Sequence, residues 1–125
     1  MTIKIGINGM GRIGRMVIRT IFENEFKDIK IKHINNRSSS EVSSNLLKYD
    51  SVHGQFKQKI TFNKNSLTIG KHKISFSQET NIDDINWSKH GVDYVLECTG
   101  KFNSKDKLYT HLKNGAKKVI VSAPC

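Results

Sequence analysis

The sequence has little cysteine and no long apolar run. Its two cysteines, Cys98 and Cys125, cannot form a disulfide framework, so a reducing cytoplasm is the simplest location. No run approaches the roughly 20 apolar residues of a membrane span, and the N-terminus has no apolar segment with a cleavage site, so no secretory signal is expected. Hydrophobic residues make up only 36% of the chain but cluster in short runs. A length of 125 residues favours one domain, over residues 1–125, with its own core.

Acidic residues are also scarce: 11 Asp and Glu against 21 Lys and Arg give a formal net charge of +10. Such an excess is compatible with nucleic-acid binding. The lysines are scattered, however, and no arginine-rich helix, zinc-ligand set or aromatic RNA-binding strand accompanies them. We therefore expect most lysines to be solvated and no nucleic-acid partner, while the positive field would attract anionic ligands. A non-catalytic RNA-binding module remains the alternative from another class, which a salt-dependent titration would test.

The most informative feature is a G-x-G-x-x-G run formed by Gly9, Gly11 and Gly14. It follows an apolar stretch, 3–7, and leads into a helical pattern, 16–22. In that context the first glycine permits the tight strand-to-helix turn, the second lets the backbone approach a pyrophosphate, and the third lets helix and strand pack closely. The positive end of the helix then faces the phosphates. A glycine-rich turn without a ligand does not explain this spacing, so the run predicts dinucleotide binding.

The remaining patterns predict an α/β fold, a Rossmann-type doubly wound parallel sheet with an inserted antiparallel hairpin region. Strands are expected at 2–8, 29–35, 92–98 and 119–121, and helices at 11–23, 38–49 and 104–114. The first helix is expected to bury a stripe of Ile13, Val17, Ile18 and Ile21, and a capping box of Ser38 and Glu41 to begin the second. Short, partly alternating runs predict the hairpins, at 55–62, 66–69 and 72–76.

Four segments of the sequence match a single protein family in their order and spacing. They are Asn8–Arg15 (NGMGRIGR), Leu47–Gly54 (LKYDSVHG), Glu97–Phe102 (ECTGKF) and Gly115–Pro124 (GAKKVIVSAP). Together they resemble glyceraldehyde-3-phosphate dehydrogenase. The LKYDSVHG segment is the most diagnostic, since ordinary Rossmann dehydrogenases lack it. The resemblance is to the cofactor-binding half of that family; the family's nucleophilic cysteine motif and general-base histidine have no counterpart in this chain.

The resemblance implies an oxidoreductase of glycolysis and gluconeogenesis that is cytoplasmic and, at full length, a homotetramer. It would convert glyceraldehyde 3-phosphate, phosphate and NAD(P)+ to 1,3-bisphosphoglycerate and NAD(P)H. Erythrose-4-phosphate dehydrogenase shares the amino-terminal pattern and stays open, although the Ser-Ala-Pro at 122–124 favours the triose enzyme. Neither Cys98, at the end of a buried strand, nor Cys125 is the catalytic cysteine, so the chain alone is expected to bind dinucleotide without turnover.

The resemblance also implies the residues that bind the cofactor. Arg12 and Ile13 would hold the pyrophosphate through backbone N–H groups, and Asn8 would bond near the adenosine. Thr99 and Ser122 would approach the dinucleotide, unless their hydroxyls only cap local backbone. These positions follow the carboxyl ends of strands, where ligands bind in open α/β sheets. No metal ligand is expected, and the whole predicted set is Asn8, Gly9, Gly11, Arg12, Ile13, Gly14, Asn36, Arg37, Thr80, Thr99, Gly100, Phe102 and Ser122.

Two positions in that set depart from the family pattern. Asn36 stands where the family usually has an aspartate that accepts hydrogen bonds from the adenosine ribose. An amide can bond the ribose but does not repel a 2′-phosphate, and Arg37 can attract one; the alternative is that Arg37 is an ordinary surface arginine. We therefore expect the use of both NAD and NADP, with a modest lean to NADP. Thr80 stands where the family has a cofactor-contacting arginine, so that contact is expected to be weakened or lost.

Overall fold

A parallel sheet forms the centre of the molecule. The structure, a computed structural model, describes residues 2–24, 28–50, 54–55, 59–98 and 105–121. In this part of the chain the seven-stranded sheet has the order β5-β6-β7-β2-β1-β8-β9. Strand β1 (Ile3–Asn8) pairs in parallel with β2 (Ile29–Asn35) on one side and with β8 (Tyr94–Glu97) on the other. Strand β9 (Lys118–Val121) continues the parallel order beside β8. The predicted parallel sheet is confirmed.

The predicted hairpin region is also confirmed. Strands β5 (Ile60–Asn63), β6 (Ser66–Ile69) and β7 (His72–Ser77) pair antiparallel with one another. Strand β7 then joins the main sheet by pairing in parallel with β2. A separate pair, β3 (Tyr49–Asp50) and β4 (Gly54–Gln55), lies outside the main sheet. The hairpins therefore extend the sheet beyond β2 and bring the end of β7 beside the end of β2.

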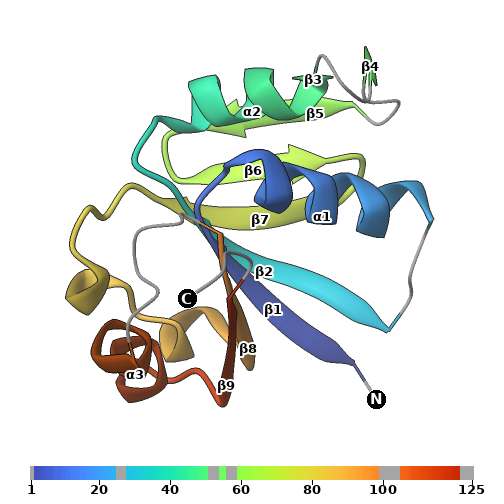
Figure 1. Ribbon diagram of the computed structural model, residues 1–125. Helices are drawn as coiled ribbons and strands as arrows, with labels where there is room; N and C mark the ends of the chain where they lie inside the picture. The colour runs from blue at the N-terminus through green and yellow to red at the C-terminus, as the bar shows by residue number, and fades with distance from the viewer. Residues whose placement is uncertain (1, 25–27, 51–53, 56–58, 99–104, 122–125) are drawn as a thin grey trace.

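Helices cover both faces of the sheet (Figure 1). Helices α1 (Arg12–Glu23) and α2 (Ser40–Lys48) lie on one face. Helix α3 (Lys105–Lys113) lies on the other, with two single 3-10 turns, η1 (Ile82–Asp84) and η2 (Ser88–His90). No helix in the described residues is long and apolar enough to cross a membrane. This arrangement of helices on both faces of a mostly parallel sheet is the Rossmann-type α/β fold that the sequence predicts.

Each face of the sheet has its own core. On the α1 and α2 face, Ile7 of β1 and Ile18 of α1 are fully buried in one apolar cluster. On the other face, Trp87 is fully buried with Val95 and other apolar side chains. Gly6 in the middle of β1 makes room for the indole, because a Cβ there would lie 2.5 Å from Trp87 Cζ3. The glycine therefore allows a tryptophan to lie directly against the strand.

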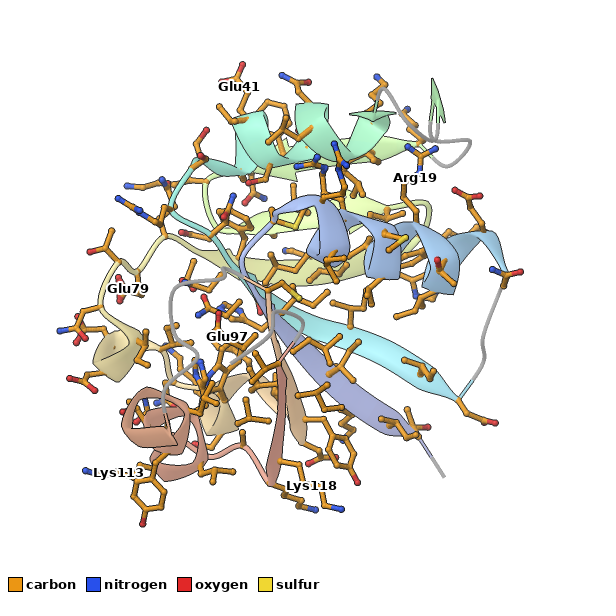
Figure 2. All side chains as sticks on the ribbon, in the orientation of Figure 1. Arg19, Glu41, Glu79, Glu97, Lys113 and Lys118 are labelled. Atoms are coloured by element: carbon orange, nitrogen blue, oxygen red, sulfur yellow. The ribbon has the colours of Figure 1, made fainter. Side chains whose placement is uncertain are left out.

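Two local predictions are wrong. Ile13 is 40% exposed and does not belong to the buried stripe of α1, whereas Arg19 is only 5% exposed. The Arg19 guanidinium donates to the Leu47 carbonyl (3.4 Å), so a buried polar tie joins α1 to the end of α2 (Figure 2). The cap of α2 is shifted by one residue from the prediction: the hydroxyl oxygen of Ser39, not Ser38, accepts the N–H of Val42 (3.2 Å). A row of three serines, 38–40, offers several caps, and Ser40 instead donates its hydroxyl to the Asn63 carbonyl of β5.

Candidate functional site

The three glycines each occupy a place that a side chain would disturb. Gly9 has a φ of 102°, a conformation that glycine adopts without strain. A Cβ on Gly14 would overlap the carbonyl oxygen of Gly9, so the helix could not lie this close to the strand. A Cβ on Gly11 would lie 3.3 Å from the Cys98 carbonyl oxygen. The turn is therefore compact, and Gly11 leaves its outer side open for the backbone of the turn to meet a ligand.

The N-terminus of α1 follows this turn and carries the properties of an anion site. The first helical hydrogen bond runs from the Arg15 N–H to the Gly11 carbonyl (3.0 Å). The N–H groups of Arg12, Ile13 and Gly14 precede it and have no partner within the helix. No side chain caps this end, and its first turn has no acidic residue. The helix dipole and these N–H groups together favour a negatively charged group beside Gly11.

The carboxyl ends of four neighbouring strands carry a continuous line of hydrogen-bonded polar side chains. Ser77 of β7, Asn35 of β2, Asn8 of β1 and Glu97 of β8 lie side by side in register. Ser77 Oγ donates to Asn35 Oδ1 (2.6 Å), Asn35 Nδ2 donates to Asn8 Oδ1 (2.9 Å), and Asn8 Nδ2 donates to Glu97 Oε1 (2.7 Å). We call these four residues the polar row. Glu97 (labelled in Figure 2) is the last residue of the row, and its Oε1 lies 2.8 Å from Nε2 of His111 on α3.

A cleft of about 140 Å³ opens beside the polar row. It lies between the glycine turn, the segment that follows β2 and the segment that follows β7. Six of the residues that the sequence predicts for the site line it: Asn8, Gly9, Gly11, Asn36, Arg37 and Thr80. The cleft thus stands at the carboxyl ends of parallel strands, where open α/β sheets bind their ligands.

Asn36 joins the glycine turn to α2. Its Oδ1 accepts the N–H of Met10 (3.1 Å), and its Nδ2 donates to Ser43 Oγ (3.0 Å). Its own N–H donates to the carbonyl of Ser77 (3.0 Å), which ties the segment after β2 to the end of β7. A carboxamide has two acceptor and two donor positions. These contacts use one acceptor and one donor, so one of each remains for a ligand in the cleft.

Comparison with known proteins shows which family has this domain. Residues 3–105 match the family model described as "Glyceraldehyde 3-phosphate dehydrogenase, NAD binding domain". The chain belongs to the glyceraldehyde-3-phosphate dehydrogenase family. It is 46% identical over 125 residues to the glyceraldehyde-3-phosphate dehydrogenase of Ajellomyces capsulatus and 45% identical over 125 residues to that of Cereibacter sphaeroides. The match covers 99% and 100% of this chain, but only 36% and 37% of those relatives.

A third relative, the glyceraldehyde-3-phosphate dehydrogenase of Thermotoga maritima, is 42% identical over 121 residues, which is 97% of this chain and 36% of the relative. The chain therefore spans little more than a third of the length of the curated relatives that it matches. Within the glyceraldehyde-3-phosphate dehydrogenase family, the part that it represents is the NAD-binding domain.

As a domain of this family, the chain places most of its predicted cofactor-binding residues around one opening. The side chains of Arg12 and Ile13 are exposed at the N-terminus of α1, next to the turn. Arg37 and Thr80 are exposed on opposite segments of the cleft wall. Four predicted residues, Thr99, Gly100, Phe102 and Ser122, lie outside the residues that the structure describes.

Arg37 is the exposed cation nearest to the departure from the family pattern at Asn36. Its backbone carbonyl accepts a hydrogen bond from Nε2 of Gln78 (3.2 Å), the residue that follows β7. This contact holds the backbone of Arg37 in place. Within the described residues, its guanidinium has no hydrogen bond or ion pair. Because the backbone is held while the charged group is unused, Arg37 can turn toward an anion at the mouth of the cleft.

Sequence reasoning missed Asn35, Met10, Glu79 and Ile82, which also line the cleft. One signal was present: Asn8 and Asn35 both end apolar strands that were predicted to be neighbours. Cys98 lines the cleft as well, but it is 7% exposed and packs in the apolar core, as expected for an inert thiol. Among the described residues, no group of three or more His, Cys, Asp or Glu could hold a metal ion.

The residues present fit a dinucleotide. The glycine turn has no side chain at Gly9, Gly11 or Gly14 that could block a pyrophosphate, and a Cβ on Gly11 or Gly14 would crowd the backbone of Cys98 or Gly9. The N-terminus of α1 offers donors without a competing carboxylate. The cleft beside Asn8 and Asn36 offers polar groups of the kind that bind a ribose. The site therefore has the groups that a dinucleotide needs.

Proposed function

We propose that residues 1–125 form the dinucleotide-binding domain of an oxidoreductase acting on glyceraldehyde 3-phosphate. The reaction would convert that aldehyde, phosphate and NAD(P)+ to 1,3-bisphosphoglycerate and NAD(P)H. The main support is the convergence of the glycine turn, the N-terminus of α1 and the polar cleft in a chain of this family. The bound nicotinamide supplies the hydride acceptor, and the residues of this chain bind and orient it. A cytoplasmic homotetramer serving glycolysis and gluconeogenesis is the corresponding proposal for the full-length protein.

The proposed contacts divide along the cofactor. The N–H groups of Arg12 and Ile13 receive the pyrophosphate, as the open N-terminus of α1 supports. Asn8 and Asn36 face the adenosine side. For the nicotinamide half, the proposal keeps the residues that the resemblance implies: Thr99, Gly100, Phe102 and Ser122. Cys98 is buried and receives no catalytic role, so the isolated chain should bind cofactor but form no NADH or NADPH from glyceraldehyde 3-phosphate and phosphate.

We further propose that the site accepts both NAD and NADP, with a modest lean to NADP. Asn36 presents an amide where a carboxylate would repel the 2′-phosphate. Arg37 lines the same cleft with an unused guanidinium, and the chain carries a net charge of +10. An exposed charge-assisted contact contributes about 1 kcal/mol, or roughly a fivefold change in affinity. That magnitude supports a preference rather than exclusion of NAD.

The test is calorimetric titration of NAD+ and NADP+ into the natural full-length protein and two variants. Asn36→Asp should weaken NADP+ much more than NAD+. The change is well tolerated by the fold, because a carboxylate can accept from both Met10 N–H and the Ser43 hydroxyl, the two groups that now contact the amide. Arg37→Ala should weaken NADP+ roughly fivefold and leave NAD+ nearly unchanged.

Lys30→Ala is the matched control, since it removes one exposed positive charge from β2 at a residue that does not line the cleft. It should leave both affinities within twofold. Two outcomes would refute the role of Asn36 in recognising the 2′-phosphate. One is a wild-type protein that does not bind NADP+, and the other is an Asn36→Asp protein that loses affinity for both cofactors equally. Failure to bind either dinucleotide would refute the site itself.

A further inference from the structure

His33 lies on β2 two residues before Asn35, a member of the polar row, and pairs with Ser75 of β7. Its side chain is almost completely buried, at 1% exposure. Its ring stacks on that of His90, with centroids 3.8 Å apart and planes 6° from parallel, and meets the ring of Trp87 edge-on at 5.6 Å. Burial, and then the neighbouring His90, lowers the pKa of His33 to about 3. At neutral pH the ring is therefore uncharged, with one donor nitrogen and one acceptor nitrogen.

Both ring nitrogens of His33 lie within hydrogen-bond distance of a serine hydroxyl. Nε2 lies 2.8 Å from Ser77 Oγ, and Nδ1 lies 2.6 Å from Ser75 Oγ. The neutral ring donates from one of these nitrogens and accepts at the other. Ser77 Oγ in turn donates to Asn35 Oδ1 (2.6 Å), which also accepts the backbone N–H of Glu79 (2.9 Å). His33 is therefore joined to the Asn35 amide through Ser77.

A second histidine adjoins the same serine. Ser75 Oγ donates to the carbonyl of Lys32 (2.9 Å) and lies 3.2 Å from Nδ1 of the partly exposed His90. His90, Ser75, His33, Ser77 and Asn35 therefore form a continuous series of hydrogen-bonded side chains that ends at the cleft.

Asn35 transmits this support to two walls of the cleft. Its Oδ1 accepts from Ser77 and from Glu79 N–H, and its Nδ2 donates to Asn8 Oδ1 (2.9 Å) and to the Glu79 carbonyl (3.0 Å). All four hydrogen-bonding positions of the amide are thus in use. Asn8 lies on the wall formed by β1, and the backbone of Glu79 leads to Thr80 on the wall beyond β7. The Asn35 amide therefore fixes the position of one wall of the cleft relative to the other.

We infer that His33 is a positioning residue for the adenosine end of the cofactor. Through Ser77 it holds the Asn35 amide, which joins Asn8 to the backbone of Glu79 across the cleft. This role rests on the proposed binding of a dinucleotide there. His33 itself does not line the cleft, so its effect on affinity is indirect and depends on the hydrogen bond between Nε2 and Ser77.

The test compares dissociation constants for AMP and for NAD+ in the natural full-length protein, by calorimetry at pH 7.5. His33→Leu removes the hydrogen bond to Ser77 and should raise both constants roughly fivefold. His33→Gln places an amide, which can donate or accept, within reach of Ser77 and should keep both constants within twofold of the wild type. His90→Ala removes the stacked ring but no link between His33 and the cleft, and should also stay within twofold.

Each outcome bears on a different statement. Wild-type protein that binds neither AMP nor NAD+ would refute the cofactor site, and the role of His33 with it. Wild-type binding with an unchanged AMP constant in His33→Leu would reduce His33 to a packing residue. Equal losses in His33→Leu and His33→Gln would likewise overturn the inference, because the hydrogen bond to Ser77 would not matter. If His33→Leu fails to fold, Ser77→Ala breaks the next link by removing one oxygen, and an unchanged AMP constant there would be equally decisive.

Discussion

Acidification should destabilise the protein through His33, and the size of the effect can be worked out. In the folded state, burial and the neighbouring His90 lower the pKa of His33 to about 3. In the unfolded chain the pKa returns to about 6.5. The unfolded state therefore binds the proton first, so the stabilisation is complete above pH 6.5 and is lost as the pH falls toward 3. Between pH 7.5 and 5.5 the linkage relation gives a loss of about 1.4 kcal/mol in the free energy of unfolding.

This value requires only that the folded pKa lies well below 5.5. The assay is equilibrium urea unfolding of the wild type and of His33→Gln at pH 7.5, 6.5 and 5.5. The variant cannot take up this proton, so the stability difference between the two proteins should shift by about 1.4 kcal/mol across that range. Every ionisable group other than His33 is present in both proteins, so the difference isolates the His33 proton. A difference that does not change with pH would show that His33 is not buried as a neutral ring.

Two stability predictions follow from the α3 face of the sheet. Trp87→Phe removes the indole N–H that donates to Nδ1 of the buried His111 (2.9 Å). The unpaired nitrogen should lower the free energy of unfolding by about 1–3 kcal/mol, and a loss below about 0.5 kcal/mol in urea unfolding would contradict this. Gly115→Ala should cost at least about 2 kcal/mol by the same measurement, because Gly115 has a φ of 114° and a Cβ there would lie 2.5 Å from Ser88 Cβ; a neutral result would mean that the end of α3 shifts freely.

The glycine turn could be predicted because its chemistry is local. A strand, a turn and a helix in direct succession need small residues at fixed places, and Gly9 and Gly14 meet those needs within six residues. The polar row could not be predicted in the same way. Ser77 and Asn35 meet only because β7 pairs in parallel with β2, after two intervening hairpin strands. Register between strands distant in sequence is not contained in the pattern of either strand.

The errors on α1 and α2 have similar causes. Apolar spacing placed Ile13 on the buried stripe and ignored Arg19, since a periodic pattern treats every arginine as exposed. Arg19 is buried because the Leu47 carbonyl lies where its guanidinium ends, a contact between two helices that no single helix reveals. The cap of α2 was misplaced within a run of serines, where local preference is the same for each. In both cases a tertiary contact selects among positions that the local sequence pattern does not distinguish.

The pairing of β1 with β8 makes the cleft depend on residues far apart in the sequence. One edge of β1 is completed by β8, with Ile5 opposite Tyr94 and Asn8 opposite Glu97. The Cys98 N–H then donates to the Asn8 carbonyl (2.8 Å), directly behind the glycine turn. The glycine motif near the start of the sequence therefore lacks one wall of its cleft until β8 has paired with β1. The cleft is a long-range feature of the fold, because it needs a contact between residues ninety positions apart, even though the motif that reveals it is local.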